Sequence, residues 1–458
     1  MLLRPKIVAA RAVGALARRA GRGGTSLPGK VLVRLQPDAV ARLAGRLPQG
    51  SVLVSATNGK TTTVAMAAAI LEGTGTRLVH NRSGANMEGG VASALLGAAD
   101  PSGSIAGDLG LFEVDEFWLP RVAAEVEPRT LLLSNLFRDQ LDRYGELESI
   151  ADRWADVVAD RAGRTDFVLN ADDPLVADLG RDRPGVRYFG VEDDSIALPG
   201  MQHASDSKHC RRCGHPYVYE ASYLAHLGRY ACPSCGAKRP QPDVAAGDIE
   251  LHGVHGASFT LRADGAEARV ELPLPGLYNV YNALGAAALC LTLGPPLPAV
   301  AAALGQVHAA FGRAETIVVG GRPLSILLVK NPAGANEVLR TLALEEGELD
   351  VLGILNDGVA DGRDVSWIWD ADMEVLVSRI RRATCSGRRA AELALRLKYA
   401  GLDPAGIDVE PDLPAALERA LRDGEPGRPL YALPTYTALL SLRRLLAERG
   451  VARPYWEG

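Results

Sequence analysis

The sequence predicts an α/β protein with a parallel sheet in its central domain, an inserted segment with four cysteines, and a C-terminal α/β domain. Three observations predict this architecture. Short apolar runs alternate with Ala-rich helical segments between residues 52 and 189, as in a parallel sheet covered on both faces. Two Cys-x-x-Cys pairs then interrupt the alternation, and a new series of strands begins near Thr316. The predicted divisions are a helical segment at 1–48, a central domain at 49–315 with the insertion at 205–240, and a C-terminal domain at 316–458.

Length and composition indicate an ordinary multidomain globular protein. The chain has 458 residues, too many for one hydrophobic core. Its net charge of −5 and its 5% aromatic content give no reason to expect nucleic acid as a partner. No apolar run approaches the roughly 20 residues that a membrane-spanning helix needs. We therefore expect a cytoplasmic protein with at most peripheral membrane contact.

The first 24 residues predict an amphipathic basic helix, because cationic side chains interrupt the apolar residues and leave no signal-peptide core. Two interpretations stay open. The helix packs on the first domain, or it contacts the inner face of an anionic membrane. The cations are Arg4, Lys6, Arg11, Arg18, Arg19 and Arg22.

The segment 51–63 has the pattern of a phosphate-binding loop. The apolar run Val52–Val54 precedes a tight turn, and a helix-forming run follows it. Such a loop directs backbone N–H groups toward an anion, and the helix dipole adds to the attraction. Val54 occupies the place of the first glycine in the general pattern, so a plain Gly-Lys turn is the alternative. The residues expected to bind nucleotide phosphates are Asn58, Gly59, Lys60, Thr61 and Thr62, with Thr61 also on a magnesium ion.

A later strand-like run ends in acidic residues. Leu109–Phe112 leads into Glu113, Asp115 and Glu116. A carboxylate that ends a strand beside a phosphate loop is well placed to bind magnesium. The alternative is that these are solvated acids at a strand end.

Two Cys-x-x-Cys pairs predict a zinc site in the insertion. The pairs are separated by 18 residues, and each is followed by a glycine, Gly214 or Gly236, as in a tight knuckle. Four thiolates close a tetrahedral shell and leave no position for water, so the zinc ion is expected to be structural. Disulfides or free thiols are the alternatives. The predicted ligands are Cys210, Cys213, Cys232 and Cys235.

The C-terminal domain is predicted to have strands at 324–329, 351–355 and 375–377, with helices between them. Residues 355–370 are the most unusual stretch of the chain, with four aspartates, two glycines and two tryptophans. A loop of this kind at a strand end is a candidate site. A Gly-Asp turn that caps a helix is the alternative.

Several motifs together resemble the Mur ligase family: the loop Ala56–Thr62, the turn Asn170–Pro174 and the stretch 312–315. The resemblance implies a Mur ligase-like central domain that binds ATP and Mg²⁺, with Glu113 as the preferred metal ligand. Gln140 stands where most members have a His for a second magnesium ion, so a second ion would need other ligands. The residues implied to contact the nucleotide are Asn279, Asn282 and Arg313, with Tyr278 where the family has His.

Within this family, the four-cysteine insertion, Lys330–Gly334 and Asp361–Trp367 resemble the branch that amidates lipid II. The resemblance implies that the D-glutamate α-carboxyl of the stem peptide becomes D-isoglutamine in peptidoglycan synthesis, through an acyl phosphate that ammonia attacks. The sequence shows no convincing cysteine nucleophile with a His partner, and members of the branch form a heterodimer with a class I glutaminase that supplies ammonia. Asp361 is implied to complete the partner's Cys-His-Asp triad, with Asp364 and Asp357 as fallbacks.

Two other functions stay open. A stand-alone Mur or folylpolyglutamate-type ligase would add an amino acid, so the identity of the acceptor distinguishes it. A non-catalytic scaffold would only dock and activate the glutaminase. Lys60, Thr61 and Glu113 argue against the scaffold, because they form a complete set for nucleotide turnover.

Overall fold

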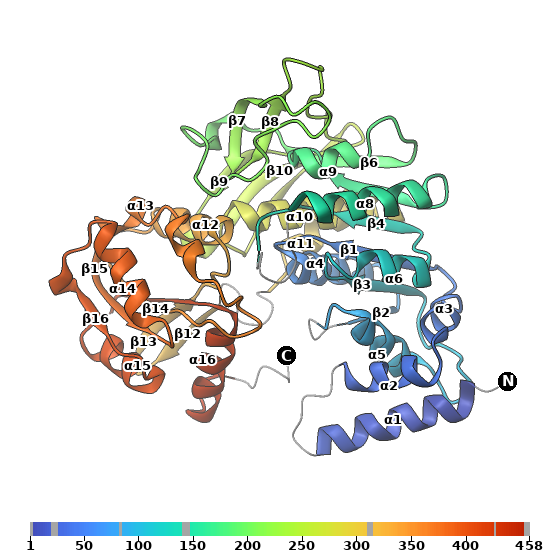
Figure 1. Cartoon of the computed structure of the whole chain (residues 1–458), viewed down its shortest axis with the longest axis horizontal. Coiled ribbons are helices and arrows are strands. Elements are labelled where there is room, and N and C mark those ends of the chain that lie inside the picture. Colours follow the sequence, from blue (N-terminus) through green and yellow to red (C-terminus); the bar gives the residue numbers. More distant parts are fainter. Residues whose placement is uncertain are drawn as a thin grey trace.

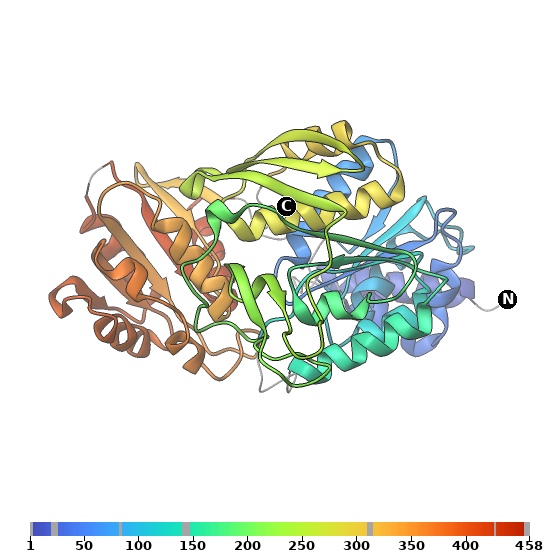
Figure 2. The ribbon, with the colours of Figure 1, turned by 90° about the horizontal axis from the view of Figure 1, so that it is seen from above.

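Two twisted sheets organise the molecule and lie side by side in Figure 1. The computed structural model describes residues 3–19, 26–81, 85–139, 147–308, 315–425 and 427–452. The larger sheet is drawn from blue to yellow and the smaller one in orange and red (Figures 1 and 2). This is the expected α/β architecture with a second sheet at the C-terminal end.

The larger sheet contains nine strands in the order β11-β10-β9-β6-β5-β4-β1-β3-β2. The strands from β9 to β2 in this order are parallel, while β9, β10 and β11 pair antiparallel. The last two, β10 and β11, form an antiparallel hairpin, as the alternation of residues 258–261 and 268–272 predicts. The bounds are β1 (Ser51–Ser55), β2 (Leu78–His80), β3 (Leu109–Glu113), β4 (Thr130–Leu133), β5 (Asp166–Asn170), β6 (Val186–Val191), β9 (Val244–Leu251), β10 (Ala257–Ala263) and β11 (Ala266–Leu272).

Helices cover both faces of this sheet, which explains why its central strands are continuously apolar. Val52 and Val54 of β1 face one core, and Leu53 faces the other. The first core includes α4 (Lys60–Gly73), α10 (Leu277–Leu293) and α11 (Leu297–Leu304). The second includes α2 (Leu27–Leu35), α3 (Ala39–Ala44), α5 (Glu88–Ala98), α6 (Leu119–Val126), α8 (Leu147–Arg161) and α9 (Pro174–Leu179).

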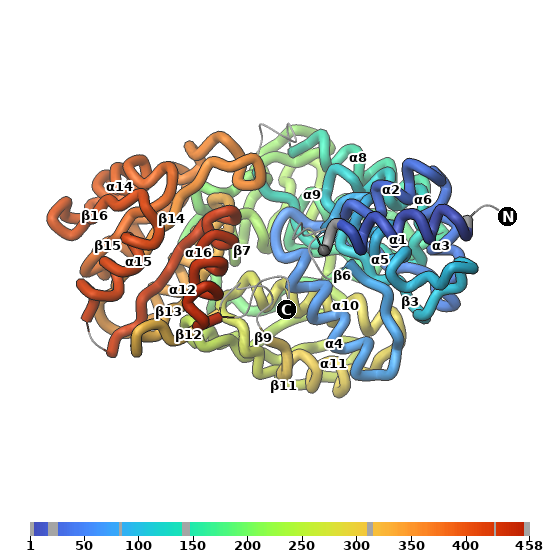
Figure 3. Tube along the Cα trace, turned by 90° about the horizontal axis from the view of Figure 1, so that it is seen from below, coloured from blue at the N-terminus to red at the C-terminus, as the bar shows by residue number. Residues whose placement is uncertain are grey.

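The N-terminal helix α1 (Leu3–Arg19) packs against α2 and α5 at the outer side of the larger sheet (Figure 3). Ile7 and Ala10 are fully buried in this contact. The Arg11 guanidinium donates hydrogen bonds to carbonyl oxygens at the C-terminal end of α5. The structure therefore has the packed arrangement, the first of the two interpretations. Among the described residues, no helix combines the length and apolarity that crossing a membrane requires.

The smaller sheet contains six strands in the order β12-β13-β17-β14-β15-β16. All neighbours are parallel except β12 and β13, which form an antiparallel hairpin. Its strands are β12 (Glu315–Val319), β13 (Arg322–Ile326), β14 (Leu349–Ile354), β15 (Ile380–Ser386), β16 (Ile407–Val409) and β17 (Leu430–Pro434). Its helices are α12 (Pro332–Leu342), α13 (Glu374–Val377), α14 (Ala390–Tyr399), α15 (Leu413–Arg422) and α16 (Tyr436–Glu448).

One predicted strand is wrong. The apolar run Val375–Val377 belongs to the short helix α13, and the strand of this region is β15, which begins five residues after Val375. An apolar run of three residues fits one helical turn as well as a strand, so the pattern alone could not distinguish them. The inserted hairpin of β7 (Val218–Leu224) and β8 (Leu227–Ala231) forms a sheet of its own.

Candidate active site and metal centre

A cavity of about 380 Å³ lies between the two sheets. Its wall combines the loop after β1, the acidic end of β3, the start of α10 and the first turns of α12. It thus lies at the carboxyl ends of parallel strands, where open α/β sheets bind ligands. Among its lining residues are Asn58, Gly59, Lys60, Thr61, Thr62, Glu113, Asp115, Glu116, Asn135, Tyr278, Asn279, Asn282, Lys330, Asn331 and Glu337.

The loop between β1 and α4 has a fixed backbone. Gly59 has a φ of 85°, and a Cβ atom at this position would lie 1.8 Å from Asn282 Oδ1. Only glycine meets both conditions, because other residues rarely adopt this φ and have no room here. The Asn135 side chain accepts the Asn58 N–H at 2.8 Å and donates to the Asn58 carbonyl oxygen at 3.0 Å. Asn135 therefore shapes the loop, a role that the sequence analysis did not identify.

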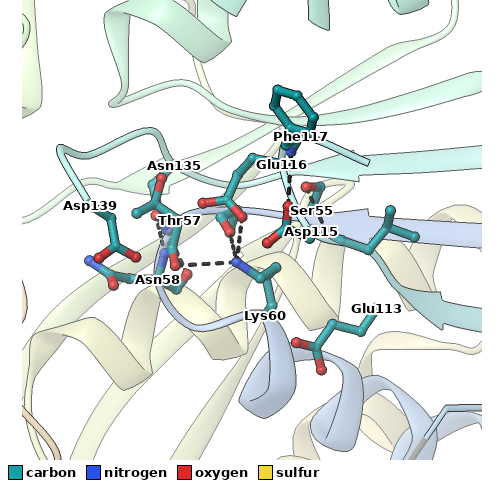
Figure 4. Close-up of polar contacts among 12 residues, drawn as sticks. Ser55, Thr57, Asn58, Lys60, Glu113, Asp115, Glu116, Phe117, Asn135 and Asp139 are labelled. Carbon is teal, nitrogen blue, oxygen red and sulfur yellow. Dashed lines mark hydrogen bonds and ion pairs between the residues drawn. The ribbon is translucent and has the colours of Figure 1, made fainter. Parts of the chain in front are cut away.

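Lys60 points back along its own loop toward Glu116 (Figure 4). Its Nζ donates to Glu116 Oε2 at 2.8 Å and to two carbonyl oxygens of the loop. Burial alone would lower the pKa of the Lys60 ammonium, but the carboxylates of Glu116, Asp115 and Glu113 outweigh burial and raise it. The cavity thus has a permanently charged ammonium, and a phosphate in the loop can replace the Glu116 carboxylate as its anion.

Thr61 and Glu113 form a pair that fits a magnesium ion. Thr61 Oγ1 lies 3.1 Å from Glu113 Oε1. Two adjacent ligands in an octahedral magnesium shell lie about 3 Å apart, since each Mg–O bond is about 2.1 Å. Asn81 holds the backbone of Glu113 with two hydrogen bonds of 2.8 and 2.9 Å. Glu116, a second-choice metal ligand by sequence, is instead paired with Lys60.

Two residues of the smaller sheet's N-terminal region reach the phosphate loop. Asn331 exchanges two side-chain amide hydrogen bonds of 3.0 and 3.3 Å with Asn58. The neighbouring Lys330 ammonium lies 2.6 Å from Asp139 Oδ2 and 3.4 Å from the Thr57 carbonyl oxygen. In the sequence, the motif Lys330–Gly334 stands out only by its resemblance to the branch of Mur ligases that amidates lipid II. Its place at the loop could not be derived, because 273 residues separate Asn58 from Asn331.

Of the residues that the family resemblance implies for the nucleotide, the structure describes Tyr278, Asn279 and Asn282. Asn279 and Tyr278 line the cavity at the start of α10, and Asn279 donates to the Pro275 carbonyl oxygen at 2.8 Å. Asn282 donates to Asn279 Oδ1 at 3.0 Å and lies against the phosphate loop. Arg313 and Gln140 lie outside the described residues.

The four predicted zinc ligands come together in the insertion. The Sγ atoms of Cys210, Cys213, Cys232 and Cys235 all lie within 4.8 Å of one another. Two of the separations are 3.5 Å, too long for a disulfide bond of about 2.05 Å and close to the edge of a tetrahedral Zn–S₄ shell with bonds of about 2.3 Å. The donor set therefore fits a zinc ion.

The two cysteine knuckles have the same backbone geometry. The N–H of Gly214 bonds to the Cys210 carbonyl oxygen at 2.8 Å, and the N–H of Gly236 bonds to that of Cys232 at 3.0 Å. Both glycines have φ near 72°, which favours glycine. Burial opposes ionisation of Cys210, but backbone N–H groups in its knuckle hold the pKa of its thiol at about 6. A thiol with this pKa is readily available as a thiolate ligand.

The four-cysteine insertion also contributes to the cavity. Its β7–β8 turn places Leu224 and Leu227 in the cavity wall. Between them, His226 is fully buried, and its ring centroid lies 4.7 Å from that of Phe137, another wall residue. Nothing in the sequence connected this hairpin with the phosphate loop.

Asp361 is buried and already bonded within the chain. Its carboxylate accepts hydrogen bonds from the Gly358 N–H at 3.0 Å, from the Thr437 N–H at 2.7 Å and from the Thr437 hydroxyl. A carboxylate has about four acceptor positions, so roughly one remains for a further donor. The adjacent residue Ala360 lines the cavity. The loop around Asp361 is thus one wall of the same site.

The two fallback aspartates differ from Asp361 in exposure and partners. Asp364 is exposed and accepts the Ser366 N–H at 2.8 Å, the turn-capping arrangement that the alternative interpretation expects. Asp357 pairs with Arg388 at 3.1 Å and with Arg389 at 3.3 Å.

The chain matches two known protein families and one relative over nearly its whole length. Residues 54–232 match the Mur ligase middle domain family, and residues 328–439 match the MurT ligase C-terminal family. The chain is 32% identical over 448 residues to the lipid II isoglutaminyl synthase (glutamine-hydrolyzing) subunit MurT of Streptococcus pneumoniae. The match covers 98% of this chain and 97% of that protein.

Solved structures share the fold. A pseudomurein peptide ligase type C from Methanothermus fervidus superposes with a TM-score of 0.68 at 22% identity, over 87% of this chain and 78% of that one. The folylpolyglutamate synthase of Mycobacterium tuberculosis, complexed with ADP and AMPPCP, superposes with a TM-score of 0.60 at 17% identity, over 92% and 98% of the two chains. The predicted Mur ligase-like architecture is therefore confirmed.

Proposed function

Because this chain belongs to the MurT family of Mur ligases, we propose that it is the ligase subunit of a glutamine-dependent enzyme that amidates lipid II. Its substrate is the D-glutamate α-carboxyl of the lipid II stem peptide, and its product is the D-isoglutamine amide. ATP supplies the phosphoryl group. The reaction belongs to peptidoglycan synthesis.

Besides family membership, one feature of the cavity supports the proposed ATP-dependent reaction. Lys60 and the Thr61–Glu113 pair face the same cavity, as a phosphoryl-transfer site requires. A carboxylate is a poor electrophile until one of its oxygens becomes a leaving group. An enzyme with this cavity can make that change by transferring the γ-phosphoryl group of ATP.

The residues of the chain have distinct tasks in the reaction. The loop N–H groups and Lys60 would hold the outer phosphates, and Thr61 and Glu113 would hold the magnesium ion. A bound magnesium ion neutralises negative charge on the phosphate oxygens. Transfer of the γ-phosphoryl group to the substrate carboxylate gives an acyl phosphate and ADP. Ammonia then attacks the acyl carbon, inorganic phosphate leaves, and loss of a proton completes the amide.

Ammonia comes from a class I glutaminase that forms a heterodimer with this chain. The Streptococcus pneumoniae relative is a subunit of a glutamine-hydrolyzing enzyme, which supports a partner of this kind. Both cysteines outside the insertion, Cys290 and Cys385, are buried, and burial raises the pKa of the Cys385 thiol to about 12. They are poor nucleophiles for glutamine hydrolysis. In the heterodimer, Asp361 orients the histidine of the partner's Cys-His-Asp triad.

Mass spectrometry of lipid II tests the ligase proposal. The full chain is incubated with lipid II, ATP, Mg²⁺ and an ammonium salt, and Lys60→Ala is the inactive comparison. The expected result is a mass change of one amidation with the wild-type chain only. If neither ammonium nor glutamine with the glutaminase produces amidated lipid II, the substrate assignment is wrong.

The same assay separates the other functions. A ligase that adds amino acids would attach a residue instead of ammonia, which gives a different mass. A scaffold would leave the amidation unchanged in Lys60→Ala when the glutaminase is present. Conversion of ATP to ADP that requires lipid II would exclude the scaffold.

A further inference from the structure

Glu337 is a buried carboxylate in the wall of the cavity that none of the steps above uses. It lies on α12 and is only 1% exposed. Neither of its carboxylate oxygens receives a hydrogen bond from any residue that the structure describes. Buried carboxylates are rarely left without donors, because removing them from water costs several kcal/mol.

The nearest cation does not satisfy this carboxylate. Arg340 Nη1 lies 3.9 Å from Glu337 Oε1, beyond hydrogen-bond distance. The Arg340 guanidinium instead donates to the carbonyl oxygens of Tyr223 at 2.9 Å and Ile196 at 2.6 Å. Burial therefore dominates over Arg340 and raises the pKa of Glu337 to about 7. Both carboxylate oxygens therefore lack a donor that a ligand in the cavity could supply.

The position of Glu337 indicates which part of a nucleotide it meets. Asn331, at the start of the same helix, contacts the phosphate loop through Asn58. Glu337 follows six residues later, about 9 Å farther along the helix axis at 1.5 Å per residue. This separation is comparable to that between the outer phosphates and the sugar of a nucleoside triphosphate. Tyr278 and Asn279, the residues implied to hold adenosine, line the same cavity.

We propose that Glu337 accepts hydrogen bonds from the 2′- and 3′-hydroxyls of the nucleotide ribose and makes the site selective for ribonucleotides. This inference rests on the proposed ATP-dependent function. A vicinal diol presents two O–H donors on adjacent carbons, which match the two unbonded oxygens of one carboxylate. Carboxylates recognise ribose hydroxyls in the same way in dinucleotide-binding folds.

The alternative donor on the same ligand is the exocyclic amine of adenine. It offers two N–H groups on a single nitrogen, of which one points away from any one acceptor. It therefore leaves one carboxylate oxygen of Glu337 unsatisfied, whereas the diol satisfies both. For this reason the observations favour the ribose.

Equilibrium binding to the full chain tests the inference, with ATP, 2′-deoxy-ATP and 3′-deoxy-ATP as the ligands in the presence of Mg²⁺. The wild-type chain is expected to bind each deoxynucleotide about tenfold more weakly than ATP, the loss typical of one hydrogen bond to a charged acceptor. Glu337→Gln should bind ATP about tenfold more weakly and discriminate among the three ligands less than about threefold. Glu346→Gln, the same change at an exposed glutamate, should behave as wild type.

Three results would overturn the inference. Equal wild-type affinity for all three nucleotides would exclude a ribose contact without reliance on any variant. Unchanged discrimination in Glu337→Gln would place the ribose contact elsewhere. Loss of affinity for 6-deamino-ATP in place of the deoxynucleotides would assign Glu337 to the base. A wild-type chain that binds no nucleotide would instead overturn the proposed function itself.

Discussion

The side-chain amides of Asn58 and Asn331 form two reciprocal hydrogen bonds of 3.0 and 3.3 Å across the junction between the two sheets. Beside them, Lys330 pairs with Asp139. Together these contacts hold α12 against the phosphate loop. They contribute to the shape of the cavity, because its wall draws on both sides of the junction.

Removing Lys330 is expected to weaken the junction. Lys330→Met leaves the Asp139 carboxylate, whose side chain is 7% exposed, without its cation. Burial already raises the pKa of Asp139, and Lys330 opposes that shift, so its loss raises the pKa further. The junction keeps its two Asn58–Asn331 hydrogen bonds and the Arg340 bonds to Tyr223 and Ile196, but it gains a buried carboxylate without a cation, which weakens it beside the phosphate loop.

Small-angle X-ray scattering of the nucleotide-free chain measures this effect as an increase in radius of gyration. The rate of lipid II amidation by Lys330→Met should also be at least about tenfold lower than that of the wild-type chain. Lys398→Met, at an exposed lysine of α14, is the matched control and should change neither quantity. A compact Lys330→Met chain with normal activity would show that the ion pair does not hold the junction.

Lys60→Ala is expected to abolish phosphoryl transfer. The substitution removes the ammonium that faces the phosphates and leaves Glu116 buried without its partner. Loss of one charged group that stabilises a transition state typically lowers kcat by about 10² to 10³. The measurement is ADP release in the presence of lipid II and ammonium. Lys60→Ala activity within tenfold of wild type would remove Lys60 from the reaction.

Glu337→Gln is expected to stabilise the chain in a pH-dependent manner. Burial raises the pKa of Glu337 from 4.5 to about 7, so the folded chain holds this proton to a higher pH than the unfolded chain. The stabilisation from the bound proton is complete below pH 4.5 and is lost as the pH rises through 7. At pH 8 the wild-type chain therefore bears a penalty of about 3 kcal/mol that the glutamine variant does not.

Urea unfolding at pH 5 and pH 8 measures the difference between the two chains. The stability gain of Glu337→Gln should be severalfold larger at pH 8. Glu346→Gln should show no such dependence, because its carboxylate is exposed. An equal gain at both pH values would mean that Glu337 titrates near its ordinary pKa.

Loss of zinc is expected to weaken nucleotide binding as well as the insertion. The four clustered cysteines belong to the same insertion as the hairpin whose turn places Leu224 and Leu227 in the cavity wall, so a bound zinc ion would stabilise that wall. Cys213→Ser should abolish zinc binding, measured as metal per chain by mass spectrometry, and lower both the melting temperature and the affinity for ATP.

Ser234→Ala is the matched control for the zinc prediction, since it alters an exposed knuckle residue without removing a ligand. It should retain one zinc ion per chain and normal ATP affinity. Zinc-free Cys213→Ser protein with unchanged ATP affinity would separate the insertion from the nucleotide site.

Asp361→Asn is expected to separate ammonia supply from ligation. If Asp361 orients the partner's histidine as proposed, removal of its negative charge should lower glutamine-dependent amidation at least about 100-fold. Amidation with an ammonium salt should change less than threefold. Thr437→Val removes one hydrogen bond to Asp361 but keeps its charge, so it should retain most glutamine-dependent activity. Equal losses with glutamine and ammonium would indicate that Asp361 only supports the fold.

The sequence by itself determined the features whose residues are close together in the chain. The phosphate loop and the cysteine knuckles are short segments, and their geometry follows from local requirements such as the positive φ of Gly59, Gly214 and Gly236. The parallel sheet followed from the continuous apolar runs. The run at 375–377 was misassigned because three apolar residues fit either a helix or a strand.

Only the tertiary structure decided how these segments meet. Nothing in the local sequence distinguishes Glu337 from other glutamates in helices. It is buried because α12 packs against the larger sheet. Asn331 and Leu224 likewise reach the cavity through contacts between distant segments. Local hydrogen-bond and backbone rules act over a few residues. Which side chains share a cavity depends instead on long-range packing, which a local pattern does not specify.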